Sequence, residues 1–207
     1  SCADGHGPRT HCLRGPAPCT AALGRMSART ALLIIDMVSP FDFPRGPALR
    51  RAALAMAPRL AGLKHRIKRA GGLCVYANDN FADWASDFDA LVQLARQSPG
   101  GEVLEAVAPE HDDLHVLKPR HSAFHQTALE SVLDAEKIDR VLVSGVATES
   151  CVLATALDAR IRELEVAVIS DCVASSSEAR RANTLSVLRY GEIPVASAAR
   201  AMTAPAR

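Results

Sequence analysis

The sequence of 207 residues has few aromatic side chains, almost no net charge and no run of about 18 apolar residues. The missing apolar run argues against a helix that spans a membrane. The formal net charge of +1 argues against nucleic acid as a main partner. The length suffices for one domain with a sizeable core, and the 48% of hydrophobic residues are ordinary for a globular protein.

The six cysteines form no Cys-x-x-Cys pair, and their distribution argues against a disulfide framework. Three lie in the first 25 residues and three lie in or beside apolar runs: Cys2, Cys12 and Cys19, then Cys74, Cys151 and Cys172. Free thiols are the default in an intracellular α/β domain. We therefore expect unpaired cysteines and a cytoplasmic location.

Residues 1–25 are rich in glycine and proline and show no apolar periodicity, so we expect a disordered extension ahead of a single domain over residues 26–207. The segment lacks the apolar core of a secretory signal. A zinc site is a weaker alternative, because the cysteine spacings fit none of the usual ligand pairs. Its candidate ligands are Cys2, His6, His11, Cys12 and Cys19.

Short apolar runs without polar alternation are typical of strands that are buried on both faces of a parallel sheet. Such runs occur at residues 30–35, 73–77, 114–117, 141–143 and 166–169, with a shorter one at 194–196. Helical patterns separate them, and Pro58 is expected to start a fresh helix. Alternating strands and helices predict one three-layer α/β/α domain with a mainly parallel sheet of about six strands.

The run at residues 141–143 leads into a turn and then a helical pattern, which places Cys151 in a first helical turn. Thr148 is expected to be the N-cap, so the thiol lies near the positive end of the helix dipole and should ionise more easily than a free one. The alternative is that Cys151 is a small buried hydrophobe that packs the helix onto the sheet.

Asp36, Lys118 and Cys151 each fall at or just after the end of a predicted strand, where parallel sheets bind ligands. A carboxylate can take the thiol proton, and an ammonium can stabilise the thiolate and orient the carboxylate. Backbone N–H groups at the turn can bind the oxyanion that forms when a thiolate attacks a carbonyl carbon. Individually, Asp36 could simply cap a loop and Lys118 could be a solvated strand end.

We expect the substrate pocket to be lined by side chains from the loops beyond the strand ends. The candidates are Phe41, Asn80, Phe81, Trp84 and His121. A local hydrophobic cluster explains the aromatic residues equally well, and His121 could be a loop hydrogen-bonder.

Three segments resemble the isochorismatase-like cysteine hydrolases, a family that includes nicotinamidase and N-carbamoylsarcosine amidase. They are ALLIID ending at Asp36, HVLKPRHSAF around Lys118 and VLVSGVATESCV around Cys151, and the resemblance extends over residues 27–198. It implies that Cys151 is the nucleophile, that Asp36 is the base for the thiol and later for water, and that Lys118 supports both.

The resemblance further implies a cis peptide bond between Val146 and Ala147, with the backbone N–H groups of Ala147 and Cys151 as the oxyanion hole. A thioester would form, release an amine or ammonia, and be hydrolysed. The resemblance also implies a homo-oligomer, a dimer or a tetramer.

The chain departs from nicotinamidases in that no histidine follows the second strand, where it reads Asn78, Asp79, Asn80 and Phe81. We therefore expect no metal and no cofactor. The loop after Asp36 also departs from related sequences, because Ser39 and Pro40 replace an Asn-Asp pair. An intact Cys151 favours a small amide, ureido or carbamoyl substrate.

Three alternatives stay open at this point. The protein could hydrolyse a vinyl ether, as isochorismatases do, or it could be a binding or scaffold module with a silent site. Cys151 could also be a redox sensor with Cys172 or Cys74 as its resolving partner.

Overall fold

The computed structural model describes residues 29–81 and 87–202. The expected extension over residues 1–25, with its alternative zinc ligands, and the pocket candidate Trp84 lie outside these described residues. Among the helices that are described, none combines the length and the apolar character needed to cross a membrane.

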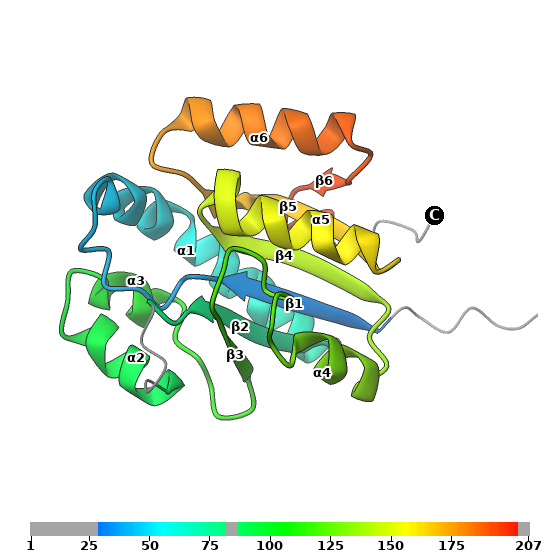
Figure 1. The fold of residues 1–207 in the computed structure, drawn as a ribbon, viewed down its shortest axis with the longest axis horizontal. Coiled ribbons are helices and arrows are strands. Elements are labelled where there is room, and N and C mark those ends of the chain that lie inside the picture. Colours follow the sequence, from blue (N-terminus) through cyan, green and yellow to red (C-terminus); the bar gives the residue numbers. More distant parts are fainter. Residues whose placement is uncertain (1–28, 82–86, 203–207) are drawn as a thin grey trace, which may run out of the picture.

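A six-stranded parallel sheet forms the centre of the molecule (Figure 1). Its strands are β1 (Thr30–Ile35), β2 (Leu73–Asp79), β3 (Leu114–Lys118), β4 (Arg140–Val146), β5 (Glu165–Ala174) and β6 (Val195–Ala196). The spatial order is β3-β2-β1-β4-β5-β6. The chain thus places β2 and β3 on one side of β1, and β4, β5 and β6 on the other side. The continuous apolar runs of the sequence are these strands, and the prediction of the fold class is confirmed.

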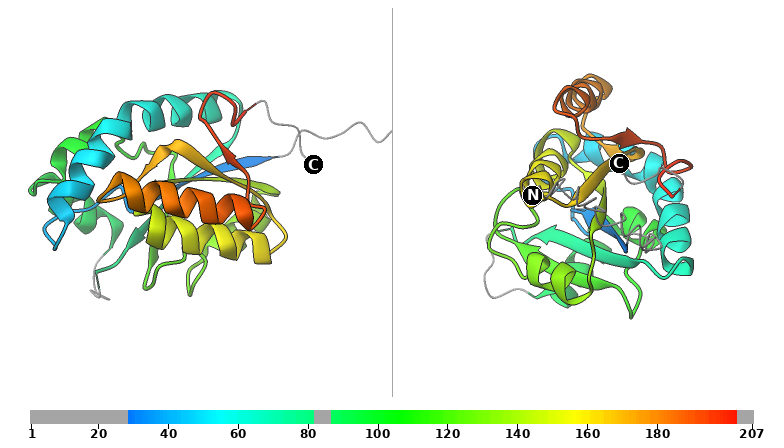
Figure 2. Two further views of the ribbon diagram at one scale, coloured as in Figure 1. Left: turned by 90° about the horizontal axis from the view of Figure 1, so that it is seen from above. Right: turned by 90° about the vertical axis from the view of Figure 1, so that its right-hand side faces the viewer.

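Helices cover both faces of the sheet (Figure 2). They are α1 (Gly46–Arg69), α2 (Phe88–Arg96), α3 (Gly101–Ala106), α4 (Leu129–Ala135), the π-helical turn η1 (Thr148–Val152), α5 (Leu153–Ile161) and α6 (Glu178–Tyr190). One core cluster joins α1, α2 and α3 to one face, and a second joins α4, α5 and α6 to the other. Alternate residues of β1 enter opposite clusters, as the pleat of a strand requires.

One helix boundary differs from that expected. Pro58 lies inside α1 and does not start a new helix. The buried residues Leu49, Ala53 and Leu60 lie on one face of α1 that continues past the proline, so packing outweighs the lost backbone hydrogen bond. Helix α2 ends at Arg96, and the short helix α3 begins at Gly101, after Pro99 and Gly100.

Candidate active site

Three side chains from separate parts of the chain meet at the carboxyl edge of the sheet. Lys118 Nζ lies 2.9 Å from Asp36 Oδ2 and 3.4 Å from Cys151 Sγ. The negative charge of Asp36 also acts on the Cys151 thiol. The Lys118 side chain is fully buried and that of Asp36 is 14% exposed. The carboxyl edge therefore brings together the trio that we predicted from strand ends.

Asp36 is held from both sides by backbone groups. It follows β1 directly with a φ of 51°, a left-handed conformation that aspartate tolerates better than most residues. Its own N–H donates to Ala77 O at 3.0 Å, and its Oδ1 accepts the N–H of Asp79 at 2.7 Å. The second oxygen, Oδ2, is the one that faces Lys118.

Gly145 allows β4 to approach β1 closely at the residue before Asp36. Its φ is 105°, and a Cβ at this position would lie 2.1 Å from the carbonyl oxygen of Ile35. The register between β4 and β5 also shifts between Val143 and Gly145. A side chain at this position would therefore push on the strand that presents Asp36.

Cys151 lies in η1, which directly follows β4. The peptide bond between Val146 and Ala147 is cis, and the N–H groups of Ser150 and Val152 both donate to Ala147 O. Thr148 is not the expected N-cap: the cap position belongs to Ala147, and the buried Thr148 hydroxyl has no hydrogen-bond partner among the described residues. The turn is π-helical because the Val152 N–H reaches back five residues.

The ionisation of Cys151 differs from our expectation. Burial, assisted by the charge of Asp36, raises the pKa of the Cys151 thiol to about 12 and outweighs the opposing charge of Lys118. Burial also raises the pKa of Asp36, although the positive charge of Lys118 opposes this. Burial lowers the pKa of Lys118, but the attraction of Asp36 overcomes it and the pKa is raised. The raised pKa favours a thiol over a thiolate at Cys151, and the expectation of an easily ionised thiol was wrong.

Two residues that sequence reasoning gave no role also reach this cluster. Asp79 Oδ2 lies 3.8 Å from Lys118 Nζ, which makes it a second carboxylate facing the same ammonium. Ser150 Oγ lies 3.7 Å from Cys151 Sγ. Asp79 is the last residue of β2, so the strand-end argument that selected Asp36 could have selected it as well.

The predicted pocket residues fall in different environments. His121 Nδ1 lies 3.7 Å from Cys151 Sγ, and the Asn80 N–H donates to Lys118 O at 3.2 Å. Phe81 is 43% exposed. Phe41 is only 2% exposed because it packs in the core under α1, so we do not interpret it as a pocket wall.

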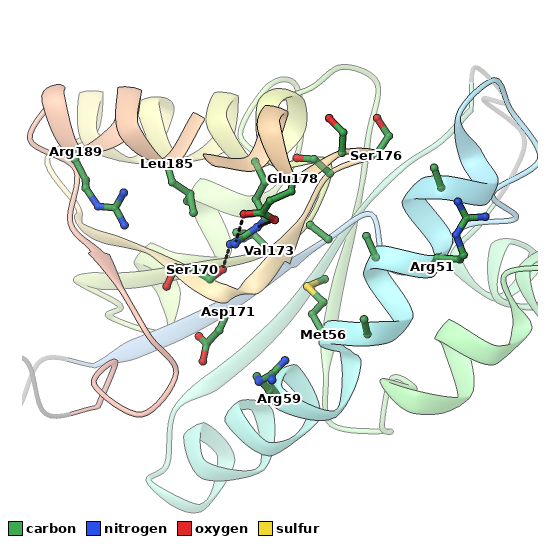
Figure 3. Close-up of a pocket in the computed structure, with 17 residues that line it drawn as sticks. Arg51, Met56, Arg59, Ser170, Asp171, Val173, Ser176, Glu178, Leu185 and Arg189 are labelled. Atoms are coloured by element: carbon green, nitrogen blue, oxygen red, sulfur yellow. Dashed lines mark hydrogen bonds and ion pairs between the residues drawn. The ribbon is translucent and has the colours of Figure 1, made fainter. Parts of the chain in front are cut away.

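Over residues 29–81 and 87–202, no three histidine, cysteine or acidic side chains are grouped as a metal site would require. A separate groove of about 910 Å³ lies between α1 and α6, and none of the trio lines it. Figure 3 shows Met56 and Arg59 of α1 on one side of it, with Leu185 and Arg189 of α6 on the other.

The redox alternative loses its geometric basis. Cys74 and Cys172 belong to the core cluster on the α1 side of the sheet, whereas Cys151 belongs to the cluster on the opposite side. All three are free thiols. A disulfide from Cys151 to either partner would have to cross the sheet.

The parallel sheet and the buried cysteine, carboxylate and ammonium at its edge define an α/β protein of the hydrolase type. The Isochorismatase domain model matches residues 30–200, and the chain belongs to the isochorismatase family of hydrolases.

An uncharacterized isochorismatase family protein, YaaI from Bacillus subtilis, is 32% identical over 151 residues, which are 73% of this chain and 83% of that protein. Maleamate amidohydrolase from Pseudomonas putida is 29% identical over 175 residues, which are 80% of this chain and 82% of that protein. The crystal structure of a cysteine hydrolase from Pseudomonas syringae pv. phaseolicola matches with a TM-score of 0.68 and 27% identity, covering 84% of this chain and 91% of that chain.

Proposed function

We propose that the protein is a metal-independent cysteine hydrolase that cleaves the C–N bond of a small amide, ureido or carbamoyl compound. The observation that carries the proposal is the contact of Lys118 Nζ with both Asp36 and Cys151 in a nearly dry setting. The similarity to a maleamate amidohydrolase supports an amide as the substrate.

The proposed reaction begins with a proton transfer inside the trio. The thiol gives its proton to the Asp36 carboxylate as Sγ bonds to the carbonyl carbon, and the carbonyl oxygen becomes an oxyanion. The backbone N–H groups of Ala147 and Cys151 are the proposed donors to it. The C–N bond then breaks as Asp36 gives this proton to the departing amine or ammonia, which leaves a thioester on Cys151. Water, giving a proton to Asp36, adds to the thioester carbon; the C–S bond breaks to release the free acid, and the sulfur recovers the proton from Asp36.

The raised pKa values suit this first step. A carboxylate whose pKa is raised by burial is a stronger base than an ordinary aspartate, so it is better matched to a thiol. Lys118 lies close to both groups, so its positive charge is retained whichever of them carries the negative charge. Proton transfer thus moves charge without creating an unpaired buried ion.

The test combines turnover with detection of the thioester. Maleamate, other small monoamides, and N-carbamoyl and ureido compounds are incubated with the protein, and released ammonia is measured. Rapidly quenched samples are analysed by mass spectrometry to detect an acyl group on Cys151. Cys151→Ala should abolish both signals, whereas Cys172→Ala, which alters a buried thiol on the other side of the sheet, should keep them.

Two outcomes would contradict the proposal. Turnover that survives Cys151→Ala would support chemistry without a cysteine nucleophile, such as vinyl ether hydrolysis. Absence of both turnover and any acyl adduct across the panel would favour the binding or scaffold module.

A further inference from the structure

Asp79 adds a second carboxylate to the cluster around the buried Lys118. It ends β2 and is the partner of Lys118 in the parallel ladder between β2 and β3, so the two side chains lie on the same face of the sheet. Its Oδ2 lies 3.8 Å from Lys118 Nζ, an ionic contact that is longer than a hydrogen bond. The Asp79 side chain is 34% exposed, against 14% for Asp36 and 0% for Lys118. Asp79 is therefore the charged group of this cluster that is most open to solvent.

Backbone hydrogen bonds fix the Asp79 carboxylate in place. Its Oδ1 accepts the N–H of Phe81 at 2.7 Å, and its own N–H donates to Asp36 Oδ1 at 2.7 Å. An aspartate that bonds the backbone two residues further on is a common turn geometry, and asparagine adopts it as well. An asparagine at this position would therefore keep the turn and remove only the charge.

The cluster holds one positive charge for two negative ones. Lys118 Nζ lies 2.9 Å from Asp36 Oδ2, so the closer carboxylate already balances its charge. Among the residues that the structure describes, neither carboxylate forms an ion pair with any other cation. The guanidinium of Arg120 donates at 3.0 Å to the backbone carbonyl of the residue before it. One negative charge therefore remains uncompensated, on the partly exposed side chain of Asp79.

This charge lies close to the reacting sulfur. Lys118 Nζ contacts Cys151 Sγ at 3.4 Å and Asp79 Oδ2 at 3.8 Å. Oδ2 can thus be no farther from Sγ than these two contacts placed end to end. A substrate whose carbonyl carbon is attacked by Cys151 must enter the field of the Asp79 carboxylate.

We propose that Asp79 is a specificity-determining residue, whose negative charge admits uncharged amides, ureas and carbamoyl compounds and disfavours substrates that carry a carboxylate. The choice among amide-type substrates rests on the proposed function. A substrate carboxylate would add a second uncompensated negative charge to a largely buried site, where like charges repel more strongly than in water. Maleamate, which carries a carboxylate, should therefore be a poor substrate of this protein, although its hydrolase is a relative.

The first test measures charge selection at Cys151 without any turnover. Iodoacetamide and iodoacetate are similar in size and differ in charge, and each is reacted with the full chain at pH 8.5, where ordinary histidine side chains are neutral. The alkylated Cys151 peptide is quantified by mass spectrometry. The ratio of the two rates is divided by the same ratio for the unfolded protein. Because both reagents attack the same thiolate, a change in the thiolate population cancels in this ratio.

Asp79→Asn should shift the ratio toward iodoacetate by about tenfold, the effect of two like charges roughly 12 Å apart at an effective dielectric constant of about 20. Asp79→Glu, which keeps the charge, should retain the wild-type ratio. Asp134→Asn is the matched control, because it removes the same charge from an exposed position on α4 and should leave the ratio unchanged. In the wild type alone, added salt should favour iodoacetate, because salt screens the repulsion.

The second test compares two amides of similar shape, the neutral diamide succinamide and the anionic monoamide succinamate. Ammonia release gives kcat/KM for each. The wild type should prefer succinamide, and Asp79→Asn should raise kcat/KM for succinamate relative to succinamide by about tenfold.

The outcomes separate this inference from the proposed function. An alkylation ratio that is unchanged in Asp79→Asn, or that shifts equally in Asp134→Asn, would overturn the inference. A wild type that favours iodoacetamide more strongly in added salt, or that hydrolyses succinamate as well as succinamide, would overturn it too. A shifted alkylation ratio in a protein that hydrolyses no amide and forms no acyl adduct would uphold charge selection by Asp79 and overturn the proposed cysteine hydrolase.

Discussion

The raised pKa of Cys151 leads to an unusual expectation for alkylation. A free thiol has a pKa of about 8.5, and a pKa of about 12 leaves roughly 3,000-fold less thiolate at neutral pH. A more basic thiolate is intrinsically more nucleophilic, which recovers part of the loss. We therefore expect iodoacetamide to modify Cys151 about 100-fold more slowly than a free thiol at pH 7.

Asp36→Asn separates electrostatics from proton transfer. It removes the negative charge that helps to raise the Cys151 pKa, so alkylation should become faster. It also removes the base that accepts the thiol proton, so amide hydrolysis should stop. One substitution should thus move the two reactions in opposite directions.

Lys118→Met should slow alkylation further. At the 3.4 Å between Nζ and Sγ, and with an effective dielectric constant of about 20, the ammonium stabilises a thiolate by about 5 kcal/mol. That energy corresponds to roughly three to four powers of ten in thiolate population.

Rates are measured against pH, with the modified cysteine located by peptide mass. Cys74 and Cys172 serve as internal references, because burial raises the pKa of each to about 12. The same peptides from unfolded protein give the free-thiol rate. If Asp36→Asn slows alkylation and hydrolysis together, or if wild-type Cys151 reacts rapidly below pH 8, the thiol is not the resting form and the reasoning fails.

Three further expectations concern stability and the pH dependence of turnover. Asp113→Ala should lower the free energy of unfolding in urea by about 1.5–3 kcal/mol, because it removes the carboxylate 2.5 Å from the buried Lys64 while Glu110 Oε1 stays 3.2 Å away; a loss below 1 kcal/mol would contradict a buried pair. Gly145→Ala should cost ~3 kcal/mol or more, since its Cβ would strike the Ile35 carbonyl, and the folded fraction should lose activity as Asp36 shifts. Asp36 must be ionised to accept the thiol proton, and burial raises its pKa, so turnover should decline on acidification at a higher pH than an ordinary aspartate allows; a pH profile that stays flat down to pH 4 would contradict this.

The strand ends of the site could be predicted from the sequence because two simple rules apply there together. Buried parallel strands have continuous apolar runs, and their carboxyl ends meet at one edge. Asp36 and Lys118 were thereby placed near Cys151 without any knowledge of the loops. The same rules do not predict the contact between Lys118 and Cys151. Lys118 is on β3, and β2 lies between β3 and β1, so the contact depends on how the side chains pack in three dimensions.

The helices were less predictable because tertiary contacts decided their ends. Pro58 costs α1 a backbone hydrogen bond, but buried residues on both sides of it keep one apolar face against the sheet. Gly100 is required for close approach, since a Cβ there would lie 1.8 Å from the carbonyl oxygen of Ser39. A glycine that serves packing cannot be told from a helix terminator by sequence alone.

The error about Cys151 has the same origin. The helix dipole argument includes only the effect that lowers the pKa of the thiol. It leaves out two effects that raise this pKa, the loss of water on burial and the negative charge of a nearby carboxylate. Together, Asp36, Lys118 and Cys151 hold one negative charge, one positive charge and one mobile proton. The proton stays on sulfur at rest, because burial disfavours the thiolate and the carboxylate adds to that effect. An electrophilic carbonyl carbon changes the balance, since bond formation removes the negative charge from sulfur as the proton reaches Asp36. A thiol kept in this way should react with a bound substrate yet resist alkylating agents and oxidants in solution, which are more reactive toward thiolates than thiols.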